Sequence, residues 1–108
     1  MKLDAHPFEK IARGEKTVEL RLNDEKRRKI AVDDVIVFSK ANQPDRTLKA
    51  RVIALHRFND FAELYSALPL NKCGYCEGDS PSPGDMEAYY SNEEQRRWGV
   101  LGIEISLL

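Results

Sequence analysis

Three residues near position 20 combine side-chain types that bind or transform polar ligands. Lys16, Glu19 and Arg21 place an ammonium, a carboxylate and a guanidinium close together in the chain. The segment from Thr17 to Leu22 alternates polar and apolar residues, and this period of two is typical of a half-buried strand. On such a strand Glu19 and Arg21 point to the same side, where they can contact each other or a shared ligand. An ordinary exposed ion pair is the alternative that the sequence leaves open.

The three side chains suit either binding or catalysis. In a binding site, Arg21 would hold a phosphate or a base edge, Lys16 would supply a point charge, and Glu19 would accept a hydrogen bond from an exocyclic amine. In an enzyme, Glu19 would be the general base or acid, and Lys16 would stabilise developing negative charge. Two neighbouring cations lower the pKa of a carboxyl group, which favours accepting hydrogen bonds over donating a proton. The residues therefore favour binding.

A basic run follows the strand. Lys26, Arg27, Arg28 and Lys29 are consecutive, and they predict non-specific contacts with the phosphates of a nucleic acid. A solvated helical face, balanced by the two acidic residues that precede the run, explains the same pattern equally well.

Aromatic residues near the end of the chain are candidates for stacking on unpaired bases. Tyr90, together with Tyr89 and Trp98, has the flat ring that single-stranded RNA sites use. Large aromatic residues in a short helix next to a strand are more often part of the core, and we expect this of Trp98.

The two cysteines do not predict a metal site. Cys73 and Cys76 have the spacing of half a zinc site, but the chain has no second cysteine pair, and only His6 and His56 remain to complete it. Neither histidine has a serine or cysteine partner at a diagnostic spacing. We therefore predict no metal, no cofactor and no nucleophilic catalysis.

The elements that would position these residues follow from periodicity, capping and turn signals. The expected strands are Thr17–Leu22, Val35–Phe38, Leu48–Phe58 and Leu101–Leu107. A turn is expected over Ala41–Arg46, and a long loop, interpreted as a mobile lid, over Leu70–Asp85. Helical segments are expected at Pro7–Arg13, Asp24–Lys29, Asp60–Pro69 and Ser91–Trp98.

The connections between the middle strands are too short for the crossovers that parallel strands need. The sequence therefore predicts an α+β fold built on a mostly antiparallel sheet, closed or partly closed, with short flanking helices. The length of 108 residues predicts a single domain over 1–108.

Composition limits the classes of function. The chain is 42% hydrophobic and 32% charged, and no apolar run is long enough to cross a bilayer, so we expect a soluble, cytoplasmic protein without membrane contact. The net charge is −1, but residues 1–54 carry 13 Lys and Arg against 9 Asp and Glu, whereas residues 55–108 carry 4 against 9. The first half can form a basic face, although a mixed surface is an equal alternative.

Several motifs together resemble a known family. Gly14, Lys16, Glu19 and Arg21 match the pattern Gly-x-Lys-x-x-Glu-x-Arg, and an apolar strand over Val35–Phe38 follows at the expected place. The C-terminal part of the chain contains further residues that match the same family, namely Met86, Tyr89-Tyr90-Ser91 and Gly99-Val100-Leu101-Gly102-Ile103. In these features the chain is similar to the ASCH family within the PUA-like group.

The resemblance implies a PUA-like β-barrel in which Lys16, Glu19 and Arg21 line a cleft for RNA. The family includes RNA binders, some ribonucleases and an amidohydrolase of acylated cytidine. The amidohydrolases carry a Thr nucleophile where this chain has Glu19, so that activity is not carried over. A second departure is Asp33, which stands where the family commonly has Gly and predicts a different turn.

The main hypothesis is thus an RNA-binding or nucleotide-binding module with no evident DNA specificity. The first alternative is a small hydrolase acting on RNA or a modified nucleoside, with Lys16 and Glu19 as catalytic residues. The second is a protein-interaction adaptor. The sequence does not predict the oligomeric state.

Overall fold

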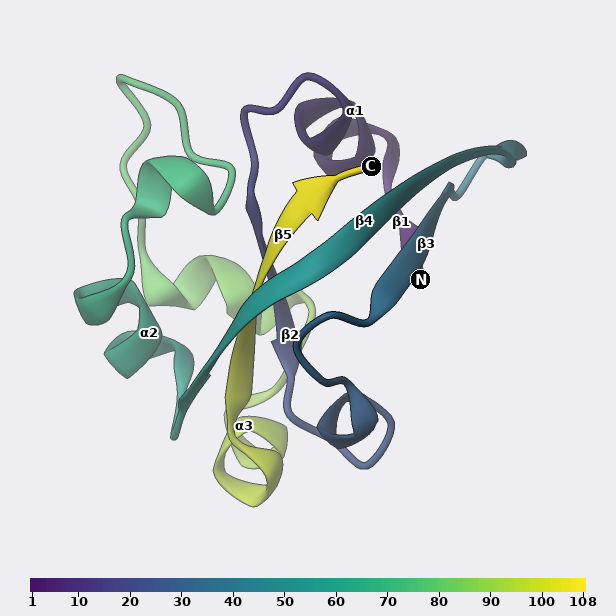
Figure 1. Ribbon diagram of the computed structural model, residues 1–108. Helices are drawn as coiled ribbons and strands as arrows, with labels where there is room; N and C mark the ends of the chain where they lie inside the picture. Colours follow the sequence, from purple (N-terminus) through teal and green to yellow (C-terminus); the bar gives the residue numbers. More distant parts are fainter.

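The strands form one five-stranded sheet that curls into a half barrel (Figure 1). The computed structural model describes residues 1–108, and the spatial order of the strands is β1-β3-β4-β5-β2. β1 runs parallel to β3, and the other neighbouring strands are antiparallel. The strands are β1 (Lys2–Leu3), β2 (Val18–Leu22), β3 (Val35–Lys40), β4 (Gln43–Phe58) and β5 (Val100–Leu107).

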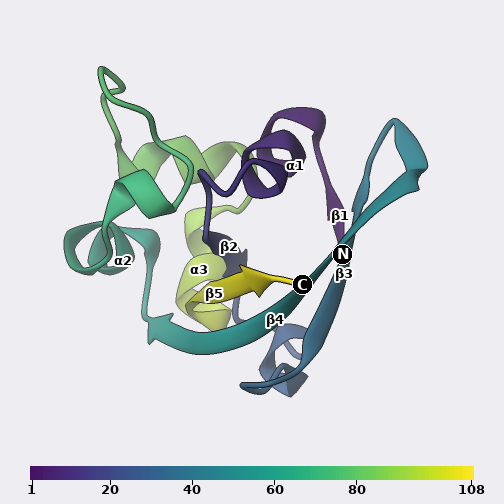
Figure 2. The ribbon, with the colours of Figure 1, turned by 45° about the horizontal axis from the view of Figure 1, so that its top comes forward.

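Short helices flank this sheet. Figure 2 shows α2 and the segment after it on one side of β2, with β3 on the other. No helix has both the length and the apolar character needed to cross a membrane. The α-helices are α1 (Ala5–Ala12), α2 (Phe61–Ala67) and α3 (Asn92–Trp98), and the 3₁₀ helices are η1 (Arg27–Lys29), η2 (Leu70–Lys72) and η3 (Pro83–Ala88).

The caps of two helices form as the sequence predicts. The side chain of Asp60 accepts a hydrogen bond from the backbone N–H of Glu63, at the start of α2. Ser91 and Glu94 make a reciprocal capping box at the start of α3. Each cap satisfies backbone donors that the first turn of a helix leaves without partners, so these two helix starts are encoded locally.

Two apolar cores lie on opposite faces of the sheet. The first lies against α1 and includes Phe8 and Phe38 from α1 and β3, together with Leu101 and Ile103 from β5. The second lies on the other face of β2 and β5 and includes Phe61 and Leu64 of α2, along with the alternating side chains Val18, Leu20 and Leu22. Both faces of β2 are thus covered, although the alternation predicts one wet face.

The α+β class and the mostly antiparallel, partly closed sheet predicted from the sequence are confirmed. The predicted turn over Ala41–Arg46 is wrong, because only Ala41 and Asn42 form the turn and β4 begins at Gln43. The register is irregular here: Ser39 pairs with Thr47 and Lys40 with Gln43. Residues 44–46 therefore have no partner on β3, which accommodates a proline that cannot donate a hydrogen bond.

Two further details differ from the predictions. β1 carries no recognisable sequence signal because it has only two residues. The segment Leu70–Asp85 holds η2 and the start of η3 and is not a structureless loop. Its predicted mobility stays a prediction.

Asp33 adopts a backbone conformation that glycine enters more easily. Its φ is 79°, and its N–H donates to the carbonyl of Val52 at 2.8 Å. Asp is among the non-glycine residues that tolerate this left-handed region best. The acidic residue can therefore occupy a turn position that glycine enters with less strain.

The junction between α3 and β5 generates a prediction about stability. Gly99 has a φ of 73°, and a Cβ atom added there would lie 2.9 Å from the carbonyl oxygen of Phe58. We expect Gly99→Ala to lower the free energy of unfolding by about 1 to 3 kcal/mol, because it adds both backbone strain and a clash. Urea unfolding followed by the fluorescence of Trp98, the single tryptophan, measures the change.

Gly84→Ala is the matched control. Its added Cβ would meet only the hydroxyl of Ser82 at 3.5 Å, which is an ordinary contact. Similar unfolding free energies for the two variants would contradict the argument from Gly99.

Candidate functional site

The two ends of the half barrel, β1 and β2, are not joined by backbone hydrogen bonds, and a cavity of about 350 Å³ lies at this seam. We call it the seam cavity. One wall comes from β1 and the start of α1, another from β2, and a third from α2 and the segment of residues 73–90. Lys16, Glu19, Arg21 and Tyr90, four of the predicted site residues, line it together.

Glu19 is the centre of an ion-paired cluster at the base of this cavity. Its Oε1 accepts hydrogen bonds from Lys16 Nζ at 2.9 Å and from the backbone N–H of Leu20 at 3.1 Å. Its Oε2 accepts a hydrogen bond from Arg21 Nη2 at 3.1 Å. The side chains of Lys16, Glu19 and Arg21 are 10%, 5% and 16% exposed. The alternative of an exposed ion pair is therefore wrong.

The register of the sheet explains this burial. Glu19 lies opposite Ile103 and Arg21 opposite Leu101. Directly opposed residues of two strands share a face, so both charged side chains project toward the first core. Because β2 is the last strand of the sheet, the same side chains also reach the seam. A sequence pattern reports which residues share a face, but it does not report whether a second layer covers that face.

The charged neighbours control the protonation of Glu19. Burial by itself raises the pKa of a carboxyl group, but the charges of Lys16 and Arg21 and their hydrogen bonds outweigh it, and the pKa of Glu19 is lowered. The group is therefore ionised at neutral pH. Because the Glu19 carboxylate is ionised and already accepts three hydrogen bonds, it is a good hydrogen-bond acceptor but a weak general acid or base.

Lys16 is held by the segment that covers it. A Cβ atom added to Gly74 would lie 3.3 Å from Lys16 Cδ, and Gly74 has a φ of 109°, so glycine lets the backbone pass directly over the lysine stem. The neighbouring Cys73 is buried, and this burial raises the pKa of its thiol to about 11 although the charge of Lys16 acts in the opposite direction. The thiol is therefore protonated.

Arg21 connects the two edge strands. Its Nη2 also donates a hydrogen bond to the backbone carbonyl of Lys2 in β1 at 3.0 Å. The Nε and Nη1 atoms make no hydrogen bond within the chain. Tyr90 lies close by: its burial raises the pKa of its hydroxyl, and the charge of Arg21 opposes this shift. Nε and Nη1 are thus the donors of Arg21 that a ligand can use.

Tyrosines form the wall opposite the ion-paired cluster. The hydroxyl of Tyr75 donates to Asp85 at 2.6 Å and contacts the hydroxyl of Tyr65 at 2.7 Å. Tyr90 stacks on Phe61 with ring centroids 6.0 Å apart. Tyr89 is 63% exposed at the cavity lining, so its ring is accessible.

Lys10 is a site residue that the sequence analysis did not identify. It is buried, and its Nζ donates to the carbonyl of Gly74 and lies 3.2 Å from Cys76 Sγ. Its partners are more than 60 residues away in the chain, so no local pattern reveals it. Tyr65 lies within the predicted helical segment Asp60–Pro69, and only the tertiary fold shows that it lines the cavity.

The predicted basic run lies outside the seam cavity. Within it, Arg27 pairs with Asp24 at 3.3 Å, whereas Arg28 donates to the backbone carbonyls of Asn23 and Trp98. Trp98 is half-buried and packs against the second core, in agreement with its predicted place. The structure contains no group of three or more potential metal ligands.

Comparisons with known proteins agree with this fold. The chain matches the model of the ASCH domain over residues 1–108. The crystal structure of the hypothetical protein PH0355 is similar with a TM-score of 0.79 and 27% identity, covering 100% of both chains. The solution structure of the protein PF0455 from Pyrococcus furiosus is similar with a TM-score of 0.68 and 30% identity, covering 100% of this chain and 98% of that one.

A third structure carries the family name. The crystal structure of ASCH from Zymomonas mobilis has a TM-score of 0.62 at 18% identity, with 97% of this chain and 65% of that chain covered, and this likeness supports the fold. A comparison with curated proteins finds no match. The match over the full length of the chain, together with the predicted motif residues Lys16, Glu19 and Arg21, leads to one conclusion: the protein belongs to the ASCH domain family.

Proposed function

We propose that the seam cavity binds a nucleotide of a single-stranded RNA. Membership in the ASCH family supports the coarser description, an RNA-binding-like domain. A volume of about 350 Å³ lies within the range of pockets that take small ligands. The proposal assigns the ligand to a particular place in the fold, namely the seam between β1 and β2.

The observation that carries the proposal is the partly satisfied polar cluster at the base of the cavity. Arg21 keeps Nε and Nη1 without hydrogen bonds in the chain, and each of these nitrogens can donate to an oxygen of a phosphate or to an acceptor of a base. Glu19 Oε2 accepts only one hydrogen bond in the structure, so it can take another from an exocyclic amine. Lys16 adds positive charge beside both groups.

The tyrosine wall adds a stacking surface. Tyr89 has an exposed ring, whereas one side of the Tyr90 ring is already occupied by Phe61. Aromatic rings stack on unpaired bases with little regard to sequence. We therefore assign the stacking contact with the base to Tyr89, whereas Tyr90 forms part of the cavity wall.

The same geometry favours binding over the hydrolase alternative. Glu19 is ionised and already accepts three hydrogen bonds, whereas a general base or acid works best with a pKa near the working pH. The adaptor alternative does not use the charged cavity. Neither alternative has a specific contact in its favour.

The first prediction concerns Arg21. We expect Arg21→Met to weaken binding of a fluorescently labelled, 5′-phosphorylated RNA dinucleotide by roughly 1 to 3 kcal/mol, because the positive charge and the hydrogen bonds from Nε and Nη1 are lost. Arg21→Lys keeps the charge next to Glu19 but lacks the planar fork, so it should lose most of the same affinity. Fluorescence anisotropy at low salt measures binding, and circular dichroism establishes that each variant is folded.

Arg51→Met is the matched control. Arg51 is exposed on β4 and donates to the backbone carbonyl of Asp33, away from the cavity lining. It should bind the dinucleotide as the wild type does. No binding by the wild type, or equal affinity of the Arg21→Met variant, would contradict the proposal. Cleavage of RNA by the wild type but not by Glu19→Gln would favour the hydrolase alternative.

The second prediction separates stacking from other contacts of Tyr89. We expect Tyr89→Ala to weaken dinucleotide binding by about 1 to 3 kcal/mol, the usual contribution of one stacked base. Tyr89→Phe keeps the ring and should bind as the wild type does. If Tyr89→Phe instead loses as much affinity as Tyr89→Ala, the hydroxyl matters and stacking is the wrong explanation.

The third prediction is the pH dependence that Glu19 gives to stability. Near pH 7, Glu19→Gln should lower the free energy of unfolding by about 3 kcal/mol, because two buried cations lose their counter-charge. The pKa of Glu19 is lowered in the folded protein, so its stabilisation is fully present above the ordinary value of 4.5 and is lost as the pH falls through the folded pKa. Urea unfolding at several pH values should therefore show the wild type and the variant converging in acid.

Glu15→Gln is the control for this measurement. Glu15 pairs with Arg13 on the surface, where both side chains are 54% exposed, so its loss should change stability little at any pH. A constant difference between wild type and Glu19→Gln from neutral pH to acid would show that the charge of Glu19 is not the stabilising feature.

A further inference from the structure

A second hollow lies at the end of the molecule where β4 leads into α2 and α3 leads into β5. It has a volume of about 570 Å³, larger than the seam cavity. We call it the arginine groove, and its main lining residues are Arg57, Asp60, Glu63, Arg96, Arg97 and Trp98.

The arginines of this groove make no hydrogen bond and no ion pair. The chain has nine arginines, and Arg57, Arg96 and Arg97 are the three whose side chains make no hydrogen bond in the structure. None of the three forms an ion pair. Their guanidinium groups thus keep all of their donors for an external acceptor.

The two carboxylates of the groove do not compete for these donors. Asp60 accepts the backbone N–H of Glu63 as the cap of α2. Glu63 in turn accepts the backbone N–H of Asn59 at 2.9 Å and its side-chain amide at 3.2 Å. Both acids keep their negative charge but make their hydrogen bonds at the start of α2, so three arginines face two carboxylates without pairing with them.

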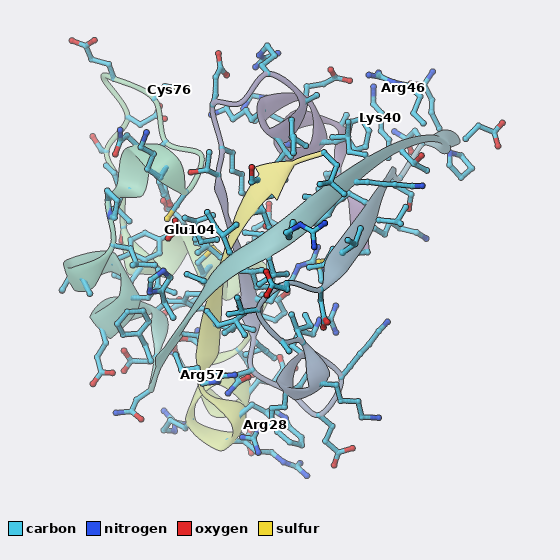
Figure 3. All side chains as sticks on the ribbon, in the orientation of Figure 1. Arg28, Lys40, Arg46, Arg57, Cys76 and Glu104 are labelled. Carbon is cyan, nitrogen blue, oxygen red and sulfur yellow. The ribbon has the colours of Figure 1, made fainter.

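Two arginine side chains make cation–π contacts with the indole ring of Trp98. The guanidinium carbon of Arg97 lies 4.9 Å from the centre of the indole ring, and that of Arg28 lies 5.5 Å from it. Arg28 Nη2 also donates to the Trp98 carbonyl at 3.2 Å. Figure 3 shows Arg28 and Arg57 at the α3 end of the molecule. The basic run is thus joined to the groove, and its arginines favour phosphates over bases as ligands.

The groove begins just beyond the end of β2. Arg21 lines the cavity, and Asn23, the residue that follows β2, lines the groove, so the two linings come within two residues of each other in the chain. Burial lowers the pKa of the Met1 amino group, and the positive charges of Arg21, Lys26 and Arg27 lower it further. Arg21 at the cavity and Arg28 beside Trp98 thus place a cation close to each hollow.

We propose that the arginine groove is a second, sequence-independent binding site for the phosphodiester backbone of a nucleic acid strand. This inference rests on the proposed function, because the strand it describes is the one whose nucleotide occupies the seam cavity. Phosphates repeat along every strand, and guanidinium groups bind them bidentately. The groove supplies affinity and direction, while the cavity selects the nucleotide.

Paired ligands of different length test this inference. A labelled RNA dinucleotide fits the cavity alone, whereas an RNA octanucleotide can extend into the groove. In fluorescence anisotropy we expect the double variant Arg57→Gln with Arg96→Gln to lose about tenfold in affinity for the octanucleotide and none for the dinucleotide. The plot of log affinity against log salt concentration should also become less steep, by about 1.4. Each phosphate contact on a single strand contributes roughly 0.7 to the steepness, and the variant removes two contacts. Both residues are exposed, so the variant should remain folded.

The double variant Lys49→Gln with Arg51→Gln is the matched control, since it removes two positive charges from exposed positions of β4 outside the groove. An equal loss of octanucleotide binding in this control would show that only overall charge matters and would overturn the inference. Wild-type affinity and salt slope in the groove variant would overturn it as well. The inference would also be overturned if an eight-residue polyglutamate peptide displaced the octanucleotide as readily as unlabelled RNA does.

The two proposals fail separately in this design. If Arg21→Met binds the dinucleotide as the wild type does, the cavity proposal fails, and the groove is still tested by the octanucleotide. If the dinucleotide responds to Arg21→Met but the octanucleotide ignores the groove variant, only the groove inference fails.

Discussion

The structure depends on one buried carboxylate at the place where the sheet fails to close. Glu19 holds Lys16 on one side and Arg21 on the other, and Arg21 continues to the backbone of Lys2 on the opposite edge strand. In a fully closed barrel, backbone hydrogen bonds would join the two edges. Here side chains join them, and their unused hydrogen-bonding positions face a cavity. The chemistry of the site and the closure of the fold therefore use the same three residues.

This arrangement explains why β2 must be covered on both faces. Its apolar side chains face α2 and the second core, whereas Glu19 and Arg21 lie beside the first core. Low polarity on both sides strengthens the attraction between the charges and makes an unpaired charge expensive. The segment of residues 70–90 contributes by covering Lys16 through Gly74 and by placing tyrosines across the cavity. Removing that cover would expose the cluster to water and weaken it.

The sequence predicts the local features well, because caps, strand alternation and motif spacing depend on neighbouring residues. It identifies the starts of α2 and α3, the strand that carries Glu19, and three charged residues that meet in space. It does not reveal that Glu19 is buried, since that burial depends on β5, which is distant in the chain. Lys10 is missed for the same reason: its contacts lie on the segment after η2. The turn after β3 is misplaced because a bulge lets Pro44 sit within a strand.

The charged seam has a consequence for protein engineering. Replacing a buried ion-paired cluster by well-packed apolar residues is often neutral or stabilising, because desolvation no longer opposes folding. A laboratory selection for heat resistance alone would therefore be expected to enrich simultaneous apolar substitutions at Lys16, Glu19 and Arg21, and so to discard the polar chemistry of the cavity. Retention of all three charges in a stabilised variant would require that the selection also demand ligand binding. Thermostability and the proposed ligand binding thus compete for the same positions in this half barrel.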